Sequence, residues 1–358
     1  MDYPPISLAH LRAMTDCTGL FQHGHHSVPN RRMGYTTDDN ARALIVAARH
    51  YERTGEDLDL AVTYLGYLHH AQDPERRFLN VMTFERQFLC EDCTQDCYGR
   101  AMWGLGCAAS SGLPDNVRIV ARKLFDTSIV WAGDLDSPRA RAYTMLGMYE
   151  RLRGEEVAAD LASDIGFLAD SLLANLRNSA ADDWYWYERY LTYGNAIIAH
   201  AMLVAAAVTG KKKHVEAARK TIQFLTDNLI IDGRMEIIGN DGWYTYGKER
   251  SWYDQQSIDA GYTVDLYARA YHLLGDKEYL DLAKIAFSWF FGNNRSGVSV
   301  YDPATGSCYD AVTPWGLNLN QGAESIVCLL LAQQAMEDLG VKSGEPDKRR
   351  KQRKPGSS

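Results

Sequence analysis

The sequence of 358 residues predicts an all-α protein built as an (α/α)6 toroid. Six segments rich in Ala, Leu and Met carry apolar residues nearly all round, as expected of helices that are buried on most sides. Six other segments alternate with them and carry charges on one face and apolar residues at helical spacing on the other. The alternation runs unbroken from about Ser7 to Gly340, so we expect one domain over residues 1–341.

The first group of segments is expected to form the inner ring. Each one starts after a polar or Gly-containing stretch, and five of the six run into a Gly near the end, as helices commonly do. In chain order they begin at Asp39 (DNARALIVAARHY), Tyr98 (YGRAMWGLGCAASSG), Arg139 (RARAYTMLGMYERLRG), Asn195 (NAIIAHAMLVAAAVTG), Asp259 (DAGYTVDLYARAYHLLG) and Gly322 (GAESIVCLLLAQQAMEDLG).

The amphipathic segments are expected to form the outer ring, at 7–21, 58–72, 115–133, 158–177, 212–229 and 277–292. The first of them would pack beside the last inner helix and close the ring. The alternative is an open array of one repeated helical hairpin. The repeat lengths vary too much for a regular solenoid, and twelve helices is the number that a toroid needs, so we favour the closed ring.

The charge of the chain restricts its partners. The formal net charge is −8, and the segment 342–358 contributes +5, which leaves −13 on the rest. An acidic body argues against nucleic acid and anionic membranes as main partners. The segment 342–358 has almost no apolar residues and is expected to be a disordered basic tail.

The sequence also carries expectations about compartment and metal. No secretory signal and no apolar run of the ~20 residues needed for a membrane span are visible. Seven Cys, an odd number, favour reduced thiols and a cytoplasmic protein. Cys90, Cys93 and Cys97 resemble half of a metal site, but no spaced partner pair accompanies them. We therefore expect free thiols and no metal, and the absence of nucleotide-binding fingerprints predicts no cofactor.

In an alternating toroid all inner helices run the same way, so their N-termini surround one mouth. Acids, amides and aromatics gather in the loops that lead into these helices. Any single acid there could simply cap a helix or complement its dipole. All six loops are harder to explain in this way, because several contain more of these residues than one cap requires.

These residue types suit the cleavage of glycosides, which uses one protonated and one ionised carboxyl group across the scissile bond. Glu188 lies in the aromatic segment DDWYWYERYLTYGNA (182–196), where desolvation would raise its pKa, so it is the expected general acid. The alternative is that Glu188 pairs with Arg189 or another Arg. Asp39 is the leading candidate for the base, and Asp254 and Asp259 are the others.

Further residues near the expected mouth are candidates for substrate binding. Trp and Tyr would stack on sugar faces, while Arg, Asn and Gln would bind hydroxyl groups. The set is Asp38, Arg42, Asp96, Arg100, Trp103, Arg139, Trp186, Tyr187, Tyr193, Asn195, Trp252, Gln255, Asn320, Gln321 and Glu324. The turn-rich segment 300–310 is expected to form a short hairpin over the mouth.

Five motifs resemble a family of bacterial (α/α)6 domains: GYTTDDNARALI, DCYGRAMWGLG, WYWYERYLTYGNA, YDPATGSCYDAV and NLNQGAES. The resemblance spans about 8–339. Such domains are often described as glycosyltransferases because similar ones follow a glycosyltransferase module, and others stand alone near mannoside-utilisation genes. More broadly, the chain resembles six-hairpin glycosidases, an analogy of fold.

The resemblance implies an oligosaccharide substrate, and a glycosyltransferase or glycoside phosphorylase of the same pathway as a partner. The given sequence holds no nucleotide-sugar domain beside the toroid, so we do not expect glycosyltransferase activity from it. The motif WYWYERYLTYGNA has Tyr193-Gly194-Asn195 where the family pattern is Tyr-Asp-Asn, which puts an acid at position 194 in doubt.

The leading hypothesis is therefore a glycoside hydrolase that acts on a β-mannoside or a similar oligosaccharide. A non-catalytic carbohydrate-binding or regulatory partner of a glycosyltransferase is the second. A sugar epimerase or polysaccharide lyase is the third. An epimerase would favour His pairs at the inner helix ends, and the acidic body disfavours the uronate-binding cleft of a lyase.

Overall fold

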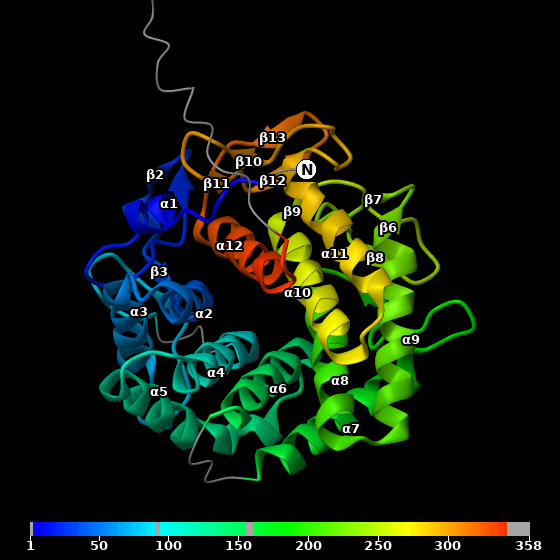
Figure 1. Cartoon of the computed structure of the whole chain (residues 1–358), viewed down its shortest axis with the longest axis horizontal. Helices are drawn as coiled ribbons and strands as arrows, with labels where there is room; N and C mark the ends of the chain where they lie inside the picture. Colours follow the sequence, from blue (N-terminus) through cyan, green and yellow to red (C-terminus); the bar gives the residue numbers. More distant parts are fainter. Residues whose placement is uncertain (1–2, 90–93, 155–159, 342–358) are drawn as a thin grey trace, which may run out of the picture.

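The computed structural model describes residues 3–89, 94–154 and 160–341. Within these residues, an inner and an outer ring of helices surround one axis (Figure 1). The inner ring is α2 (Thr37–Thr54), α4 (Gln95–Ala109), α6 (Pro138–Leu152), α8 (Asn195–Thr209), α10 (Ser257–Leu274) and α12 (Ala323–Asp338). The outer ring is α1 (Ala9–Ala13), α3 (Leu58–Ala71), α5 (Asp115–Ser128), α7 (Leu161–Ser179), α9 (Lys212–Leu229) and α11 (Lys277–Ser288).

The inner ring is closed. Each inner helix packs on the next one along the chain, and α12 packs against both α10 and α2. The side-chain amide of Gln334 on α12 donates to the backbone oxygen of Val46 on α2 over 2.9 Å. The (α/α)6 toroid predicted from the sequence is confirmed, and the open array is excluded.

The outer segments differ from expectation mainly at their ends. The first was expected over 7–21, but α1 covers only Ala9–Ala13. The carboxylate of Asp16 accepts the N–H groups of Thr18 (2.7 Å) and Gly19 (3.3 Å) and turns the chain away from the helix. As expected, α1 still packs on α12. Short 3-10 turns are present at η1 (Arg31–Met33), after α5 at η2 (Ile129–Asp134) and after α11 at η3 (Trp289–Phe291).

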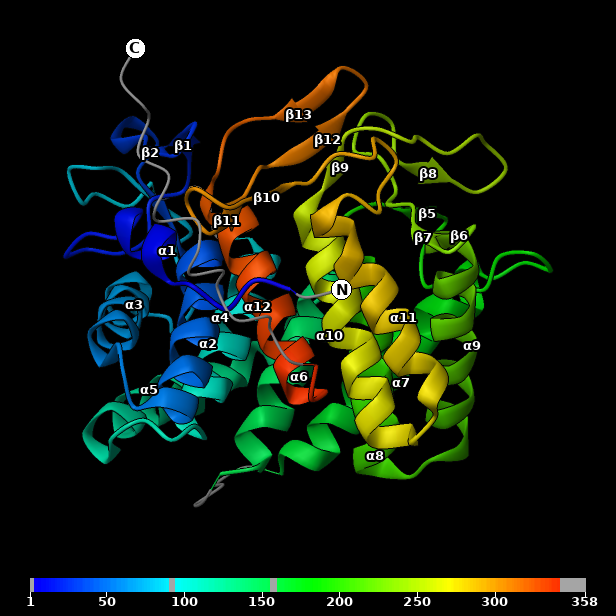
Figure 2. The same ribbon diagram turned by 45° about the horizontal axis from the view of Figure 1, so that its top comes forward.

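Short strands decorate the end of the toroid where the inner helices begin (Figure 2). They pair as β1 (Gly24–His25) with β2 (Val28–Pro29), β3 (Tyr35–Thr36) with β4 (Val81–Met82), β5 (Tyr190–Leu191) with β8 (Tyr244–Thr245), and β6 (Ile230–Ile231) with β7 (Arg234–Met235). β12 (Ala311–Thr313) pairs with both β13 (Gly316–Asn318) and β9 (Gln255–Gln256). The hairpin expected within 300–310 is β10 (Tyr301–Asp302) with β11 (Ser307–Cys308).

Hydroxyl groups, and not acids, are the N-caps of three inner helices. The hydroxyl groups of Thr36, Thr94 and Ser137 each accept the backbone N–H of the third residue of α2, α4 and α6, respectively. The acids of these first turns, such as Asp38 and Asp96, are therefore not the N-caps. This answers the sequence alternative in which the acids only cap helices.

Two sequence expectations lie outside the described residues: Cys90 and Cys93 of the cysteine cluster, and the tail 342–358. In the described part of the chain, no helix combines the length and the apolar character needed to cross a bilayer.

Candidate functional site

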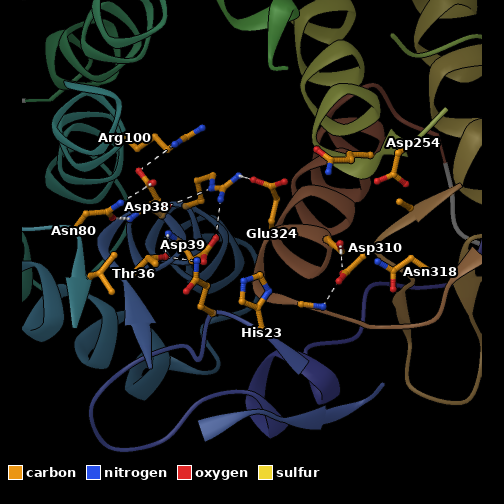
Figure 3. Close-up of a pocket in the computed structure, with 17 residues that line it drawn as sticks. His23, Thr36, Asp38, Asp39, Asn80, Arg100, Asp254, Asp310, Asn318 and Glu324 are labelled. Atoms are coloured by element: carbon orange, nitrogen blue, oxygen red, sulfur yellow. Dashed lines mark hydrogen bonds and ion pairs between the residues drawn. The ribbon is translucent and has the colours of Figure 1, made fainter. Parts of the chain in front are cut away.

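A cavity of about 340 Å³ lies in the mouth of the toroid (Figure 3). Its walls come from the starts of α2, α4 and α12, from the loop before α10 and from the β12–β13 hairpin. The described lining is Gln22, His23, Thr36, Asp38, Asp39, Arg42, Asn80, Val81, Arg100, Asp254, Gln256, Asp310, Ala311, Asn318, Gly322, Glu324 and Ser325. Of the sequence candidates, it brings together Asp38, Asp39, Arg42, Arg100, Asp254 and Glu324.

Arg42 links the first turns of α2 and α12. Its guanidinium contacts Asp39 over 2.6 Å and Glu324 over 3.1 Å. The other oxygen of Asp39 accepts the hydroxyl of Thr36 over 2.7 Å. Asp39 is thus buried and engaged at both oxygens. The Glu324 side chain is 40% exposed, and its second oxygen accepts no hydrogen bond from a described residue.

A second arginine holds the neighbouring acid. Arg100 on α4 contacts Asp38 over 3.0 Å, and the side-chain amide of Asn80 donates to the other oxygen of Asp38 over 3.2 Å. The Arg100 guanidinium also lies over the ring of Tyr143, 4.8 Å from its centroid. Asp38 is therefore fixed at the cavity wall rather than free.

An adjoining cavity of about 540 Å³ continues the mouth past Asp38, Asn80 and Arg100, which line both. On its far side, Asp96 accepts the hydroxyls of Ser137 (2.8 Å) and Tyr193 (2.7 Å). The two cavities together form an elongated groove, which we call the mouth groove.

The opposite wall of the first cavity carries Asp254 and Asp310. Asp310 accepts the backbone N–H of Gly322 (2.7 Å) and the hydroxyl of Ser325 (2.6 Å) and thereby anchors the start of α12. The carboxyl group of Asp254 receives no hydrogen bond from a described residue, although one of its oxygens is buried. Glu324 lies between this wall and the wall formed by Asp38 (Figure 3).

Burial shifts two of these carboxyl groups. Desolvation raises the pKa of Asp39 and outweighs the opposing charge of Arg42. Desolvation also raises the pKa of Asp254, and the nearby charges of Asp241 and Asp310 add to this shift. Unlike Asp39, Asp254 has no guanidinium beside it.

Glu188, the expected acid, forms a buried ion pair with Arg139 over 2.8 Å. Arg139 also donates to the backbone oxygen of Tyr193 (2.7 Å) and to the hydroxyl of Thr192 (2.6 Å). Glu188 is not part of the described lining of either cavity. The structure therefore favours the alternative, an ion pair of Glu188 with an Arg, because Arg139 engages its buried carboxylate.

Asp259 and Asn195 are buried below the mouth. Asp259 accepts the backbone N–H of Asn195 at the start of α8 over 3.4 Å. Burial is the largest cause that raises the pKa of Asp259 to about 7. The Asn195 side chain bonds the backbone of Thr192 and holds the chain that enters α8. Neither residue lines the described cavities.

Most of the aromatic candidates do not face the groove. Trp103 is buried inside the inner ring, stacked on Tyr143. Trp186 and Tyr187 are buried between the outer helices, where Trp186 stacks on Phe224 of α9. Trp252 lies between two guanidinium groups at 4.2 Å, those of Arg250 and Arg295. These four rings are therefore engaged by other side chains of the protein. Tyr193 alone of the aromatic candidates lines the described groove.

The amide candidates mostly hold loops in place. Gln255 is fully buried between Glu236 and the indole N–H of Trp289. Gln321 bonds Asp302 and Thr305 and ties α12 to the β10–β11 hairpin. Asn320 accepts the backbone N–H of His26. The groups that do offer amides to the cavity are Gln22, Asn80, Gln256 and Asn318.

The sequence missed several lining residues for identifiable reasons. Asn80 stands in an irregular loop, and only the pairing of β3 with β4 brings it beside Asp38. Asp310 and Asn318 flank the β12–β13 hairpin, and their approach to α12 depends on strand register. Among the described residues, no group of three or more His, Cys, Asp or Glu could hold a metal ion.

No family model and no curated protein sequence matches the chain. Solved structures share its fold. A cellobiose 2-epimerase from Bacillus thermoamylovorans is 11% identical over 93% of this chain and 96% of its own, with a TM-score of 0.70. A sugar epimerase from a ruminal bacterium is 15% identical over 90% and 94%, with a TM-score of 0.68. A family 76 α-mannanase from Bacteroides thetaiotaomicron is 12% identical over 86% and 87%, with a TM-score of 0.60.

Proposed function

We propose that the protein is a glycoside hydrolase that cleaves an oligosaccharide in the mouth groove. The observation that carries this proposal is the contrast between two cavity acids, Asp254 and Glu324. Asp254 has a pKa raised by burial and no protein donor, whereas Glu324 is half open to solvent and paired with Arg42. Glycoside cleavage needs such a division between one carboxyl group that gives a proton and one that takes it.

We assign Asp254 as the general acid and Glu324 as the general base. Asp254 gives its proton to the glycosidic oxygen as the bond to the anomeric carbon breaks. Glu324 takes a proton from water, whose oxygen bonds to that carbon, so the products are two free sugars. Asp39, which the sequence favoured as the base, acts as a positioning residue, because it holds Arg42 from the side opposite Glu324.

The substrate is expected to be neutral and polyhydroxylated. The described cavity offers both donors and acceptors, from its arginines, its carboxylates and the amides of Asn80, Gln256 and Asn318. Mannosides are the first class to test, in keeping with the sequence resemblance and with a family 76 α-mannanase of the same fold. We also propose that the protein acts in the same pathway as a glycosyltransferase or a glycoside phosphorylase.

The decisive experiment is the substitution Asp254→Asn, assayed on linear mannan and glucan oligosaccharides by mass and anomeric NMR. We expect turnover to fall at least ~100-fold on an unactivated glycoside, since general acid catalysis is worth about 10²–10⁴. A substrate with a good leaving group should be partly spared. Asp281→Asn on the exposed face of α11 is the matched control. Wild-type turnover by the Asp254 variant would refute the assignment.

A sugar epimerase is the second candidate, because two of the compared structures of this fold are epimerases. Epimerisation needs groups that remove and return a proton at carbon. Among the described lining residues of the cavity, His23 is the one histidine available. A product of unchanged mass with altered configuration, abolished by His23→Ala and kept by Asp254→Asn, would favour the epimerase over the hydrolase.

A further inference from the structure

The most exposed large apolar side chain in the described residues stands beside the mouth groove. Trp315 is 95% exposed, at the tip of the β12–β13 hairpin. This hairpin stands above the rim at the mouth end of the toroid (Figure 2). Three other aromatic side chains in the described residues are exposed to a smaller extent: Phe84 (43%), Phe167 (59%) and Tyr190 (42%). Trp315 stands out by its nearly complete exposure, and an indole combines a large apolar face with a polar N–H, which suits it to recognition.

The hairpin that carries Trp315 is well held. β12 pairs on one side with β13 and on the other with β9, so the hairpin belongs to a three-stranded sheet. The turn itself is tightened by Thr313, whose hydroxyl donates to the backbone oxygen of Gly316 (3.1 Å) and accepts the N–H of Trp315 (3.3 Å). Trp315 is thus presented from a defined position.

The same sheet forms a wall of the groove. Ala311 and Asn318 are register partners at the base of the hairpin, and both line the cavity, as does Gln256 of β9. Trp315 lies three residues beyond Asn318, about 10 Å along an extended strand. Trp315 itself is not part of the described cavity lining, so a sugar bound at Glu324 would reach the indole only through further sugar units of the same chain.

Apart from His23, the cavity offers no aromatic ring to a sugar. The rest of its described lining holds acids, amides, arginines and small or aliphatic residues, and the adjoining cavity contributes Tyr193 at the far end. A glycan that extends across the groove would therefore meet its stacking partners at the two ends. This arrangement differs from a closed pocket that encloses one small sugar.

We propose that Trp315 is a remote binding platform for a glycan chain, and that the substrate is an oligosaccharide or polysaccharide long enough to extend from the cavity onto this indole. The inference rests on the proposed function of the groove. A protein partner fits less well, because a stable protein interface buries roughly 1,200–2,000 Å² around an apolar core. Among the exposed large apolar side chains of the described residues, Leu319 is the one nearest to Trp315 in sequence.

The test compares binding of linear mannan and glucan oligosaccharides, from disaccharides to hexasaccharides, by calorimetry. Wild-type affinity should rise with chain length. Trp315→Ala should bind the hexasaccharide roughly two- to tenfold more weakly, as expected for one lost aromatic contact, and the disaccharide unchanged. Phe167→Ala, which removes a ring that is 59% exposed on outer helix α7, is the matched control and should behave as wild type.

The outcomes separate this inference from the proposed reaction. Length-dependent binding that Trp315→Ala weakens, without turnover, supports the platform and refutes the hydrolase. Turnover with unchanged hexasaccharide binding by Trp315→Ala refutes the platform alone. Equal losses on short and long chains also refute it. The platform is also refuted if the wild type is a dimer that Trp315→Ala converts to a monomer without an effect on glycan binding. Failure of the wild type to bind any chain refutes both proposals.

Discussion

Arginines of three successive inner helices each hold an acid at or near the mouth. Arg42 on α2 contacts Asp39 and Glu324, Arg100 on α4 contacts Asp38, and Arg139 on α6 contacts Glu188. All three are nearly buried, so each is fixed by the carboxylate beside it. The sequence suggested these three arginines as direct sugar ligands. In the structure they bind carboxylates, and they thereby determine which carboxyl oxygens remain available to a ligand.

Glu188 provides a test at this scale. Glu188→Gln keeps an oxygen that can accept from Arg139 but removes the charge, so we expect the free energy of unfolding to fall by roughly 1–3 kcal/mol. Turnover of an unactivated glycoside should stay within about tenfold of wild type, because Glu188 is engaged by Arg139. Thermal melts and steady-state kinetics measure the two effects. A ~100-fold loss of turnover at unchanged stability would return Glu188 to the role of general acid.

Asp259 predicts a pH dependence of stability. Its pKa is about 7 in the folded protein and 3.8 as an ordinary Asp, so the folded state holds a proton that the unfolded state has released. The free energy of unfolding should therefore fall as pH rises from about 4 to about 7 and then level off. Asp259→Asn, which stays neutral and can still accept from the Asn195 N–H, should remove a penalty on the order of a few kcal/mol.

The measurement is the melting temperature of Asp259→Asn and wild type at about pH 5 and about pH 8. The advantage of the variant should be larger at the higher pH. An advantage that is the same at both values, or that is larger in acid, would show that Asp259 does not hold its proton in the folded state.

At the scale of elements, glycines bring the inner helices α4 and α6 into close contact. A Cβ at Gly106 would lie 2.1 Å from the backbone oxygen of Gly147, and a Cβ at Gly147 would lie 2.4 Å from that of Met102. Neither backbone oxygen can move without moving its helix. The spacing of these two helices also sets the positions of Arg100 and Arg139, so close packing in the ring supports the mouth.

Two helical glycines should therefore respond in opposite directions to Ala. Gly106→Ala should lower the free energy of unfolding by roughly 1–3 kcal/mol, because the added methyl group overpacks α4 against α6. At Gly66 on outer helix α3, a Cβ would meet nothing within 4 Å. Gly66→Ala should therefore raise the free energy of unfolding by about 0.5–1 kcal/mol. Denaturant titrations compare the two. A stabilised Gly106 variant would mean that the contact between α4 and α6 is looser than described.

At the scale of the whole molecule, no group of three or more His, Cys, Asp or Glu among the described residues could hold a metal ion. The thiol of Cys97 is buried and donates to the Phe78 backbone oxygen over 3.6 Å. We expect a chelator to leave the melting temperature and activity unchanged, as measured by thermal melts before and after dialysis against it. A clear drop, recovered with zinc, would point to Cys90 and Cys93.

The polarity of the whole ring explains why the acids gather at one end. All inner helices begin at the same mouth, so the positive ends of their dipoles converge there, and acids in first turns such as Asp38, Asp96 and Glu324 complement that field. The hairpins of the same end add Asp254 and Asp310. A groove rich in carboxylates is thus a consequence of the architecture as well as of individual residues.

The sequence by itself determined the helical ring, its inner and outer members and the loops of the mouth, because apolar periodicity and helix stop signals are local properties of the chain. It also placed Asp38, Asp39, Asp254 and Glu324 at that mouth. Only the tertiary structure decided which side chains are free. Glu188 forms an ion pair with Arg139 of α6, and Trp186 stacks on Phe224 of α9. Such pairings join residues that are distant in sequence, so the local pattern of residue types cannot predict them.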